Sequence, residues 1–208
     1  MSLLLGSAAT AAILASGIMD RDDYVRGPLP LEAYVAAVSA AAIEADDAAI
    51  GACTEARTLE ALGIGLILTA DPIANGWREG DRRVYREKFL VKGCGPDRQV
   101  NLYVIGLPTE APKFVGGVPG TTETGYFVQR QVLERLDPQA RESFAGEGCT
   151  DVRLYGTSVD LAMDAGGQWR ENWSYDGCGL KARYWVELTA TREGVKFETS
   201  VPVNVPVP

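Results

Sequence analysis

Two segments of the chain place a glutamate among large apolar side chains at alternate positions. A β-strand directs such alternate side chains to one face. In the second half of the chain the positions are Trp169, Glu171, Trp173 and Tyr175. In the first half they are Tyr85, Glu87, Phe89 and Val91. A carboxylate in such surroundings needs hydrogen-bond donors or a cation to remain charged.

This pattern has a catalytic and a structural interpretation. In the catalytic one, Glu171 or Glu87 acts as a general acid or base in a hydrolase-like site, paired with Asp164 or Asp176. In the structural one, the glutamate accepts hydrogen bonds from an indole N–H, a backbone amide or an arginine. Recurrence in both halves favours the structural interpretation, because a duplicated protein seldom keeps catalytic residues in both copies.

The chain contains no histidine. This excludes Ser-His-Asp and Cys-His catalysis and metal sites with histidine ligands. No phosphate-binding loop, nucleophile elbow or dinucleotide motif is present. The acidic stretches 20–23 and 44–47 lack the spacing of a calcium loop and are expected to be solvated. We therefore expect no cofactor and no metal site.

Aromatic side chains gather near the C-terminus and form a candidate binding surface. The candidates are Trp169, Trp173, Tyr175 and Trp185. Exposed rings of this kind bind sugars or protein partners. Core packing is the competing role for each ring, and we expect it to be the commoner one.

An internal duplication is visible at an offset of 84 residues. Arg86-Glu87 recurs as Arg170-Glu171, and Gly93-Cys94-Gly95 recurs as Gly177-Cys178-Gly179. Strands of period two follow both cysteines in the same phase, with inward sets at 100, 102 and 104 and at 182, 184, 186 and 188. A longer first copy implies an inserted loop around 71–81.

Each copy begins with a helical pattern. The first runs from Leu31 to about Ile50, is rich in alanine and ends at Gly51. The second runs from Tyr126 to Leu136, and we expect Pro138 to break or restart it. Between the copies, residues 116–125 are rich in glycine and threonine and are expected to form a linker.

Four cysteines fall two in each copy. Four cysteines allow three pairings, and spacing does not choose among them. If the ancestral module carried one bridge, both copies inherit it, which predicts Cys53–Cys94 and Cys149–Cys178. Zinc and redox sites are less favoured because no close Cys-x-x-Cys pair exists, and free thiols are a further alternative. Disulfides imply an oxidising compartment.

The N-terminus and the net charge bear on location. Residues 3–19 carry no charge, and residues 1–19 are interpreted as an export signal, with a retained anchor or a core helix as alternatives. The formal net charge of −8 disfavours binding to nucleic acid or to an anionic membrane surface.

The segment Trp169-Arg170-Glu171-Asn172-Trp173, with Cys149 before it and Cys178-Gly179 after it, resembles a pattern in small uncharacterised bacterial envelope proteins. The match covers roughly the last third of the chain, and the first copy lacks both tryptophans. The resemblance implies an exported, disulfide-bonded domain and assigns no catalytic residue.

We therefore predict an α+β protein of two tandem helix-plus-antiparallel-β modules, 28–115 and 122–203, each with one internal disulfide and packed as a pseudo-two-fold pair with joined sheets. The expected protein is periplasmic or secreted and non-catalytic, either a structural or accessory subunit or a binding module. Its partner would be a protein of the cell envelope, with membrane contact only through an uncleaved N-terminus. The alternatives are the hydrolase-like enzyme and a small-ligand carrier with a pocket between helix and sheet.

Overall fold

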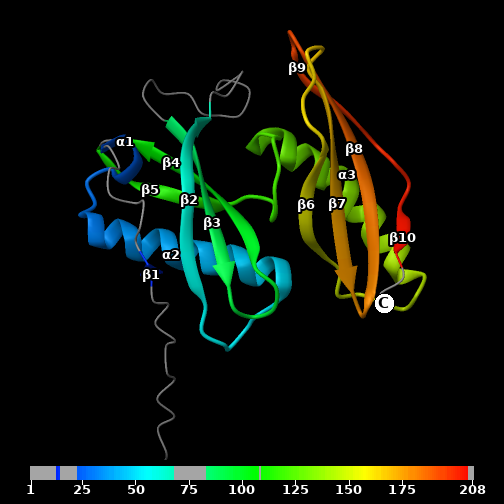
Figure 1. Ribbon diagram of the computed structural model, residues 1–208, viewed down its shortest axis with the longest axis horizontal. Helices are drawn as coiled ribbons and strands as arrows, with labels where there is room; N and C mark the ends of the chain where they lie inside the picture. The colour runs from blue at the N-terminus through cyan, green and yellow to red at the C-terminus, as the bar shows by residue number, and fades with distance from the viewer. Residues whose placement is uncertain (1–12, 15–22, 68–82, 108, 206–208) are drawn as a thin grey trace, which may run out of the picture.

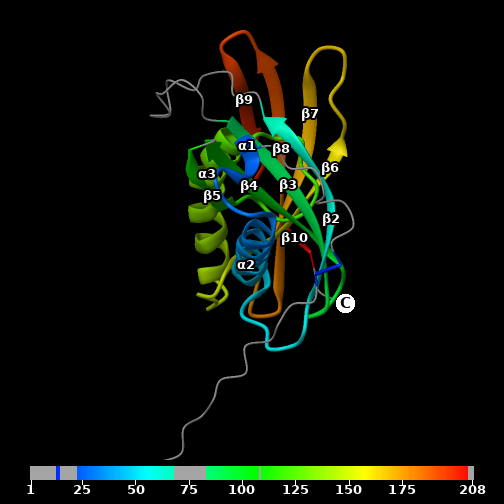
Figure 2. The ribbon, with the colours of Figure 1, turned by 90° about the vertical axis from the view of Figure 1, so that its left-hand side faces the viewer.

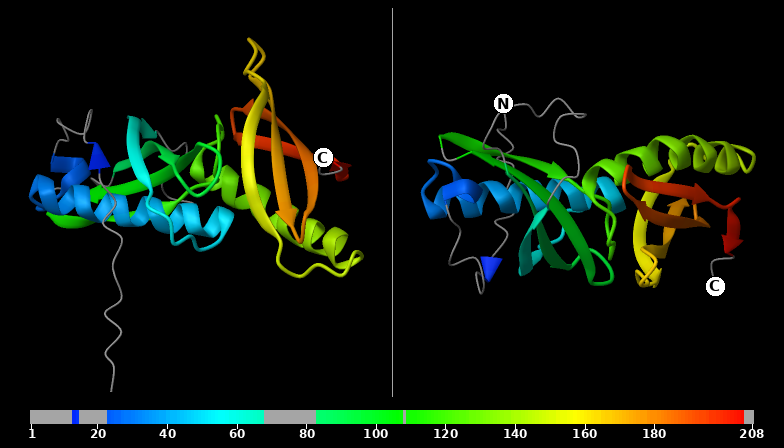
Figure 3. Two further views of the ribbon diagram at one scale, coloured as in Figure 1. Left: turned by 60° about the horizontal axis from the view of Figure 1, so that its bottom comes forward. Right: turned by 90° about the horizontal axis from the view of Figure 1, so that it is seen from above.

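The two modules lie side by side, and each consists of a long helix packed on an antiparallel sheet (Figure 1). The computed structural model describes residues 13–14, 23–67, 83–107 and 109–205. Both long helices lie on one side of the molecule, and the strands β2, β3, β6 and β7 lie on the other (Figure 2). Seen from above, the helices α2 and α3 follow one another along the long axis (Figure 3). The predicted α+β class with two modules is confirmed.

Module one has the sheet order β1-β2-β3-β4-β5, in which the short β1 runs parallel to β2 and the other neighbours are antiparallel. Its elements are β1 (Ile13–Leu14), α1 (Asp23–Arg26), α2 (Leu31–Ile50), β2 (Thr58–Ile67), β3 (Arg83–Lys92), β4 (Arg98–Leu107) and β5 (Glu110–Gly116).

Module two has the sheet order β10-β8-β7-β6, and β9 also pairs with β8. Its elements are α3 (Tyr126–Ala145), β6 (Arg153–Leu161), β7 (Gln168–Gly177), β8 (Leu180–Thr191), β9 (Gly194–Thr199) and β10 (Val203–Val205). Among the residues described, no helix is both long enough and apolar enough to cross a membrane.

Each sheet buries one face against its helix, as the period-two patterns predict. The helix-facing positions of β7 are buried, from Trp169 to Tyr175, and the facing positions of β8 are buried from Ala182 to Leu188. In module one, α2 buries Tyr34, Val38 and Ala42 against the sheet. The ring of Tyr34 also contacts that of Phe114 on β5, with centroids 5.7 Å apart.

The helix α3 continues through Pro138, so the prediction that this proline breaks or restarts the helix is wrong. Proline removes one backbone hydrogen bond, to the carbonyl four residues earlier. Both Pro138 and Glu134 are exposed, so water can hydrate the freed carbonyl. The apolar stripe continues beyond the proline to Ala140 and Phe144, and its burial holds the helix together.

The predicted pairing of the cysteines is confirmed. Cys53–Cys94 and Cys149–Cys178 each join the segment after the long helix to a hairpin turn within the same module. The turn cysteines Cys94 and Cys178 both adopt a left-handed backbone, with φ of 59° and 51°. A Cβ on the glycine before either cysteine would collide with a backbone carbonyl of the segment that follows the helix. The two bridges therefore occupy equivalent places in the two modules.

The predicted linker is an ordered part of the structure. Residues 117–125, here called the strap, first continue along the edge of β4 and then reach β6. Gly117 and Gly120 donate backbone hydrogen bonds to β4, and Thr121 donates to the carbonyl of Thr157 on β6. The predicted joining of the two sheets to each other is not found among the described strands, because the strap lies between them.

The strap and the start of α3 also cover the second face of module one's sheet. Tyr103, which the alternation places opposite the core, is buried there with Val84 and Ile105. Its ring packs on Tyr126 with centroids 4.8 Å apart. Both faces of this end of the sheet are therefore buried, which simple alternation does not predict.

Three sequence predictions fall wholly or mostly outside the described residues. The first is the inserted loop around 71–81, and the second is the export-signal interpretation of residues 1–19, apart from the two residues of β1. The third is the solvated acidic stretch 20–23, apart from its last residue. The predicted modules span residues 28–115 and 122–203. In the structure, the last strand of module one ends at Gly116 and the last strand of module two ends at Val205.

The strap gives the first testable prediction. Gly120 has a φ of 89°, and a Cβ there would collide with the backbone of Thr157. We expect Gly120→Ala to lower the free energy of unfolding by about 2 kcal/mol or more. The control is Gly125→Ala, where a Cβ meets nothing within 4 Å. Denaturant unfolding measures both, and equal stability of the two variants would contradict the strap geometry.

Candidate functional site

The carboxylate of Glu171 is buried and held by the strap. The Thr122 hydroxyl lies 2.9 Å from both carboxylate oxygens, and the Thr124 hydroxyl donates at 2.8 Å. The backbone amides of Glu123 and Thr124 donate to Oε1 at 2.9 and 3.1 Å. One side chain of β7 thus binds three consecutive residues just before α3 begins.

Two tryptophans of the same strand complete this arrangement. The indole N–H of Trp169 donates to Oε1 at 3.3 Å, and that of Trp173 donates to Oε2 at 3.2 Å. The Trp-x-Glu-x-Trp spacing has a physical reason, since alternate residues share a face and both indoles can reach the carboxylate between them. The indole and amide donors are those that the structural interpretation names.

The carboxylate pairs proposed for catalysis are not assembled. Asp176 lies on the opposite face of β7 from Glu171, five positions further along the strand. Asp164 lies in the β6–β7 turn, where its Oδ1 accepts backbone hydrogen bonds from Gly166 and Gln168. The described structure brings neither aspartate to a buried glutamate, because strand alternation and the turn separate them.

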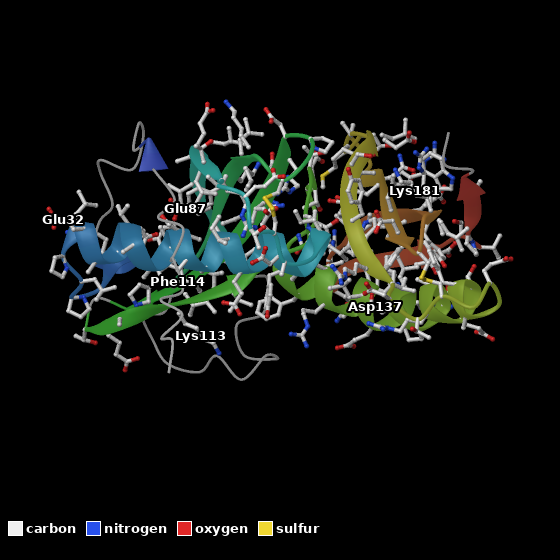
Figure 4. The ribbon with its side chains drawn as sticks, turned by 90° about the horizontal axis from the view of Figure 1, so that it is seen from below. Glu32, Glu87, Lys113, Phe114, Asp137 and Lys181 are labelled. Atoms are coloured by element: carbon white, nitrogen blue, oxygen red, sulfur yellow. A yellow bond between two sulfur atoms is a disulfide. The ribbon has the colours of Figure 1, made fainter. Side chains whose placement is uncertain are left out.

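Glu87 occupies the corresponding position in module one and is also buried. Here the helix supplies a donor, since the Tyr34 hydroxyl donates to Glu87 Oε2 at 2.7 Å. Figure 4 shows Glu87 between the sheet and α2. Gln129 occupies the position on α3 that Tyr34 has on α2, three residues after the helix begins. It accepts from the amide of Val118 and donates to the carbonyl of Thr124, so it also fastens the strap.

The four aromatic binding candidates divide between two faces of the sheet. Trp169, Trp173 and Tyr175 are buried in the core, so they cannot form the exposed platform considered above. Their burial follows from the strand phase, which directs all three toward α3. Trp185 lies on the outer face and is half-buried, with the Arg170 guanidinium 4.8 Å from its ring centroid.

The phenol of Tyr175 reaches α3, where it donates to Asp137 Oδ1 at 2.6 Å. Burial is the main cause that raises the pKa of Tyr175, and the hydrogen bond to Asp137 acts in the same direction. Figure 4 shows Asp137 on α3, on the side of the helix that meets the sheet.

Sequence reasoning missed a buried ion-pair cluster at the end of α2. Asp46 is fully buried and pairs with Arg57 and Arg98, and Arg57 also binds Asp47 at 2.7 Å. The hydrogen bond from Arg57 to Asp47 raises the pKa of this arginine. The acidic stretch 44–47 was expected to be solvated, which is wrong for Asp46. The sequence did hold a sign of this burial, because Asp46 follows Ala42 by four residues and so lies on the same buried face of the helix.

The phenol of Tyr103 lies at the junction of the modules and is fully buried. Within the part of the chain that the structure describes, its hydroxyl makes no hydrogen bond of ordinary geometry, although the side chains of Arg86 and Gln129 lie close to it. Burial raises the pKa of Tyr103 to about 12, and the nearby Arg86 guanidinium opposes this shift. Arg86 also donates to the carbonyl of Thr122 at 2.9 Å, which fixes the strap from the side of module one.

Three hollows lined by described residues are further candidate sites. One of about 350 Å³ lies at the open end of module two, beside Leu161, Trp169 and Leu188. Two smaller ones, of about 170 and 220 Å³, lie between the modules and share Ala48, Leu133 and Leu154. Cys53, Glu55 and Cys94 also lie close together, but both sulfurs are in a disulfide and are not metal ligands.

Comparisons with protein-family models, with curated proteins and with solved structures found no match.

The Glu171 site generates a prediction about stability. In Glu171→Gln the amide oxygen can replace Oε1, but the new NH₂ group then faces the indole N–H of Trp173, which can only donate. We therefore expect the free energy of unfolding to fall by about 2–4 kcal/mol. Glu187→Gln on the outer face of β8 is the matched control and should change it by no more than about 0.5 kcal/mol. A Glu171→Gln protein as stable as the wild type would contradict the structural role.

Tyr103 generates a prediction about alkaline pH. The folded protein keeps the phenolic proton to about pH 12, whereas the unfolded chain releases it near the ordinary tyrosine pKa of 10.0. Since the unfolded state then binds fewer protons, stability falls as the pH rises between these values. We expect Tyr103→Phe to reduce this slope by up to about 1.4 kcal/mol per pH unit, while leaving stability at pH 7 unimpaired. Chemical denaturation at pH values from 9 to 12 measures how the free energy of unfolding changes with pH.

The control is Tyr155→Phe, at an exposed tyrosine. An unchanged slope in Tyr103→Phe would contradict the raised pKa of Tyr103.

Proposed function

We propose that this chain is an exported, non-catalytic protein of the cell envelope that acts as an accessory subunit or binding module. The observation that carries the proposal is the set of six donor groups around Glu171. A general acid or base must reach its substrate and exchange a proton with it. The carboxylate of Glu171 is instead enclosed and bonded to the strap, which supports a structural role.

Two further features support export. Both disulfides would persist in an oxidising compartment, whereas thiols are kept reduced in the cytosol. The uncharged stretch 3–19 has the composition of a signal segment. A binding role is supported by the junction between the modules, because hollows at such junctions are common binding sites.

A small-ligand carrier is the second candidate. The hollow of about 350 Å³ in module two supports it, since its lining combines Leu161, Trp169 and Leu188 with the charged Arg170 and Glu187. A largely apolar lining with a few charged groups is typical of small-molecule sites. In this candidate the ligand is a small molecule in the hollow of module two, whereas in the first it is a protein partner at the junction between the modules.

The proposal is tested in the native host with the tagged full chain. We expect the protein in the envelope or outside the cell, with all four cysteines protected from alkylation until a reductant is added. A photo-crosslinking residue at the exposed Ala48, which lines both hollows between the modules, should give an adduct of discrete size, and one at the exposed Lys113 on β5 should not (Figure 4). Recovery from the cytosol with reactive thiols would overturn export, and absence of any adduct at Ala48 would overturn binding through the junction.

A further inference from the structure

The two hollows between the modules are neighbouring parts of one groove. They share Ala48 of α2, Leu133 of α3 and Leu154 of β6. The groove floor is made of small or aliphatic side chains, and Ala45, Ala49 and Val118 extend it. The strap residues Gly117, Val118 and Pro119 also line this groove.

One face of α3 supplies the polar side of this groove. The groove residues of α3 include Tyr126, Arg130, Leu133, Asp137 and Arg141. Spacings of three and four residues place these side chains on one stripe of a helix. Arg130 and Arg141 are separated by three helical turns, which is about 16 Å along the axis.

The charges along this stripe are unevenly compensated. Arg153 also lines the groove, but its guanidinium binds Asp151 through two hydrogen bonds. Asp137 accepts from the Tyr175 hydroxyl. Within the described residues, Arg130 and Arg141 take part in no hydrogen bond or ion pair, although the chain carries a net charge of −8. The groove is therefore a locally cationic surface on an acidic protein.

We propose that this groove binds an acidic, extended segment of a protein partner, an inference that rests on the binding role proposed above. Two carboxylates of the segment pair with Arg130 and Arg141, and an apolar side chain between them packs on Leu133 and Leu154. An extended chain rises about 3.3 Å per residue, so about five residues span the two arginines. Asp137, between the arginines, disfavours a uniformly anionic polymer and favours a segment whose middle is uncharged.

Fluorescence anisotropy with a labelled heptapeptide, Glu-Glu-Ala-Leu-Ala-Glu-Glu, tests the proposal on the full chain. We expect saturable binding that weakens by about tenfold or more in the double variant Arg130→Glu/Arg141→Glu. The matched control is Arg135→Glu, which makes the same charge change on the same helix but lies outside the groove lining. Circular dichroism verifies that each variant is folded.

Two outcomes would overturn the proposal. The first is no saturable binding by the wild type, or an equal loss in Arg135→Glu, which indicates non-specific attraction. The second is equal competition by sulfated dextran together with unchanged affinity in Leu133→Ala, which indicates a polyanion surface. If the peptide fails while the crosslink from Ala48 still forms, the groove binds a partner of different chemistry and the proposed function stands. If both fail, the binding role fails as well.

Discussion

The hydrogen bonding of one buried carboxylate determines how the two modules are joined. Glu171 presents its two oxygens to the strap at the point where the chain turns into α3, and two indoles from its own strand bond the same oxygens. A buried carboxylate costs little only when donors surround it, so the strap, the strand and the start of the helix are stable together. Arg86 of module one bonds the same strap from the other side. The junction is therefore an ordered interface and not a flexible tether.

Each module buries a glutamate carboxylate, and the two modules supply its hydrogen-bond donors from different residues. Each has a glutamate on its central strand, facing its long helix and buried beneath it. In module one the helix residue Tyr34 donates to Glu87 directly. In module two the residue at the same helical position is Gln129, which fastens the strap, and the strap donates to the glutamate. These shared features are the ones that the predicted duplication requires.

Patterns with a fixed period were predictable from the sequence, and contacts made through backbone groups were not. Alternation placed Trp169, Glu171 and Trp173 on one face, and the predicted duplication selected the disulfide pairing among three possibilities. The strap was not predicted as an ordered segment, because many of its hydrogen bonds use backbone amides and carbonyls, which leave no pattern in the sequence. Its richness in glycine and threonine is typical of a linker. Asp46 was misjudged because its partners Arg57 and Arg98 are distant in sequence. The groove between the modules depends on how the modules pack, which no local pattern specifies.

Both disulfides close loops within one module, with sequence separations of 41 and 29 residues. Neither bridge needs the other module in order to form. An oxidant can therefore crosslink each module whether or not the two have docked, so formation of the bridges and docking of the modules are separate events.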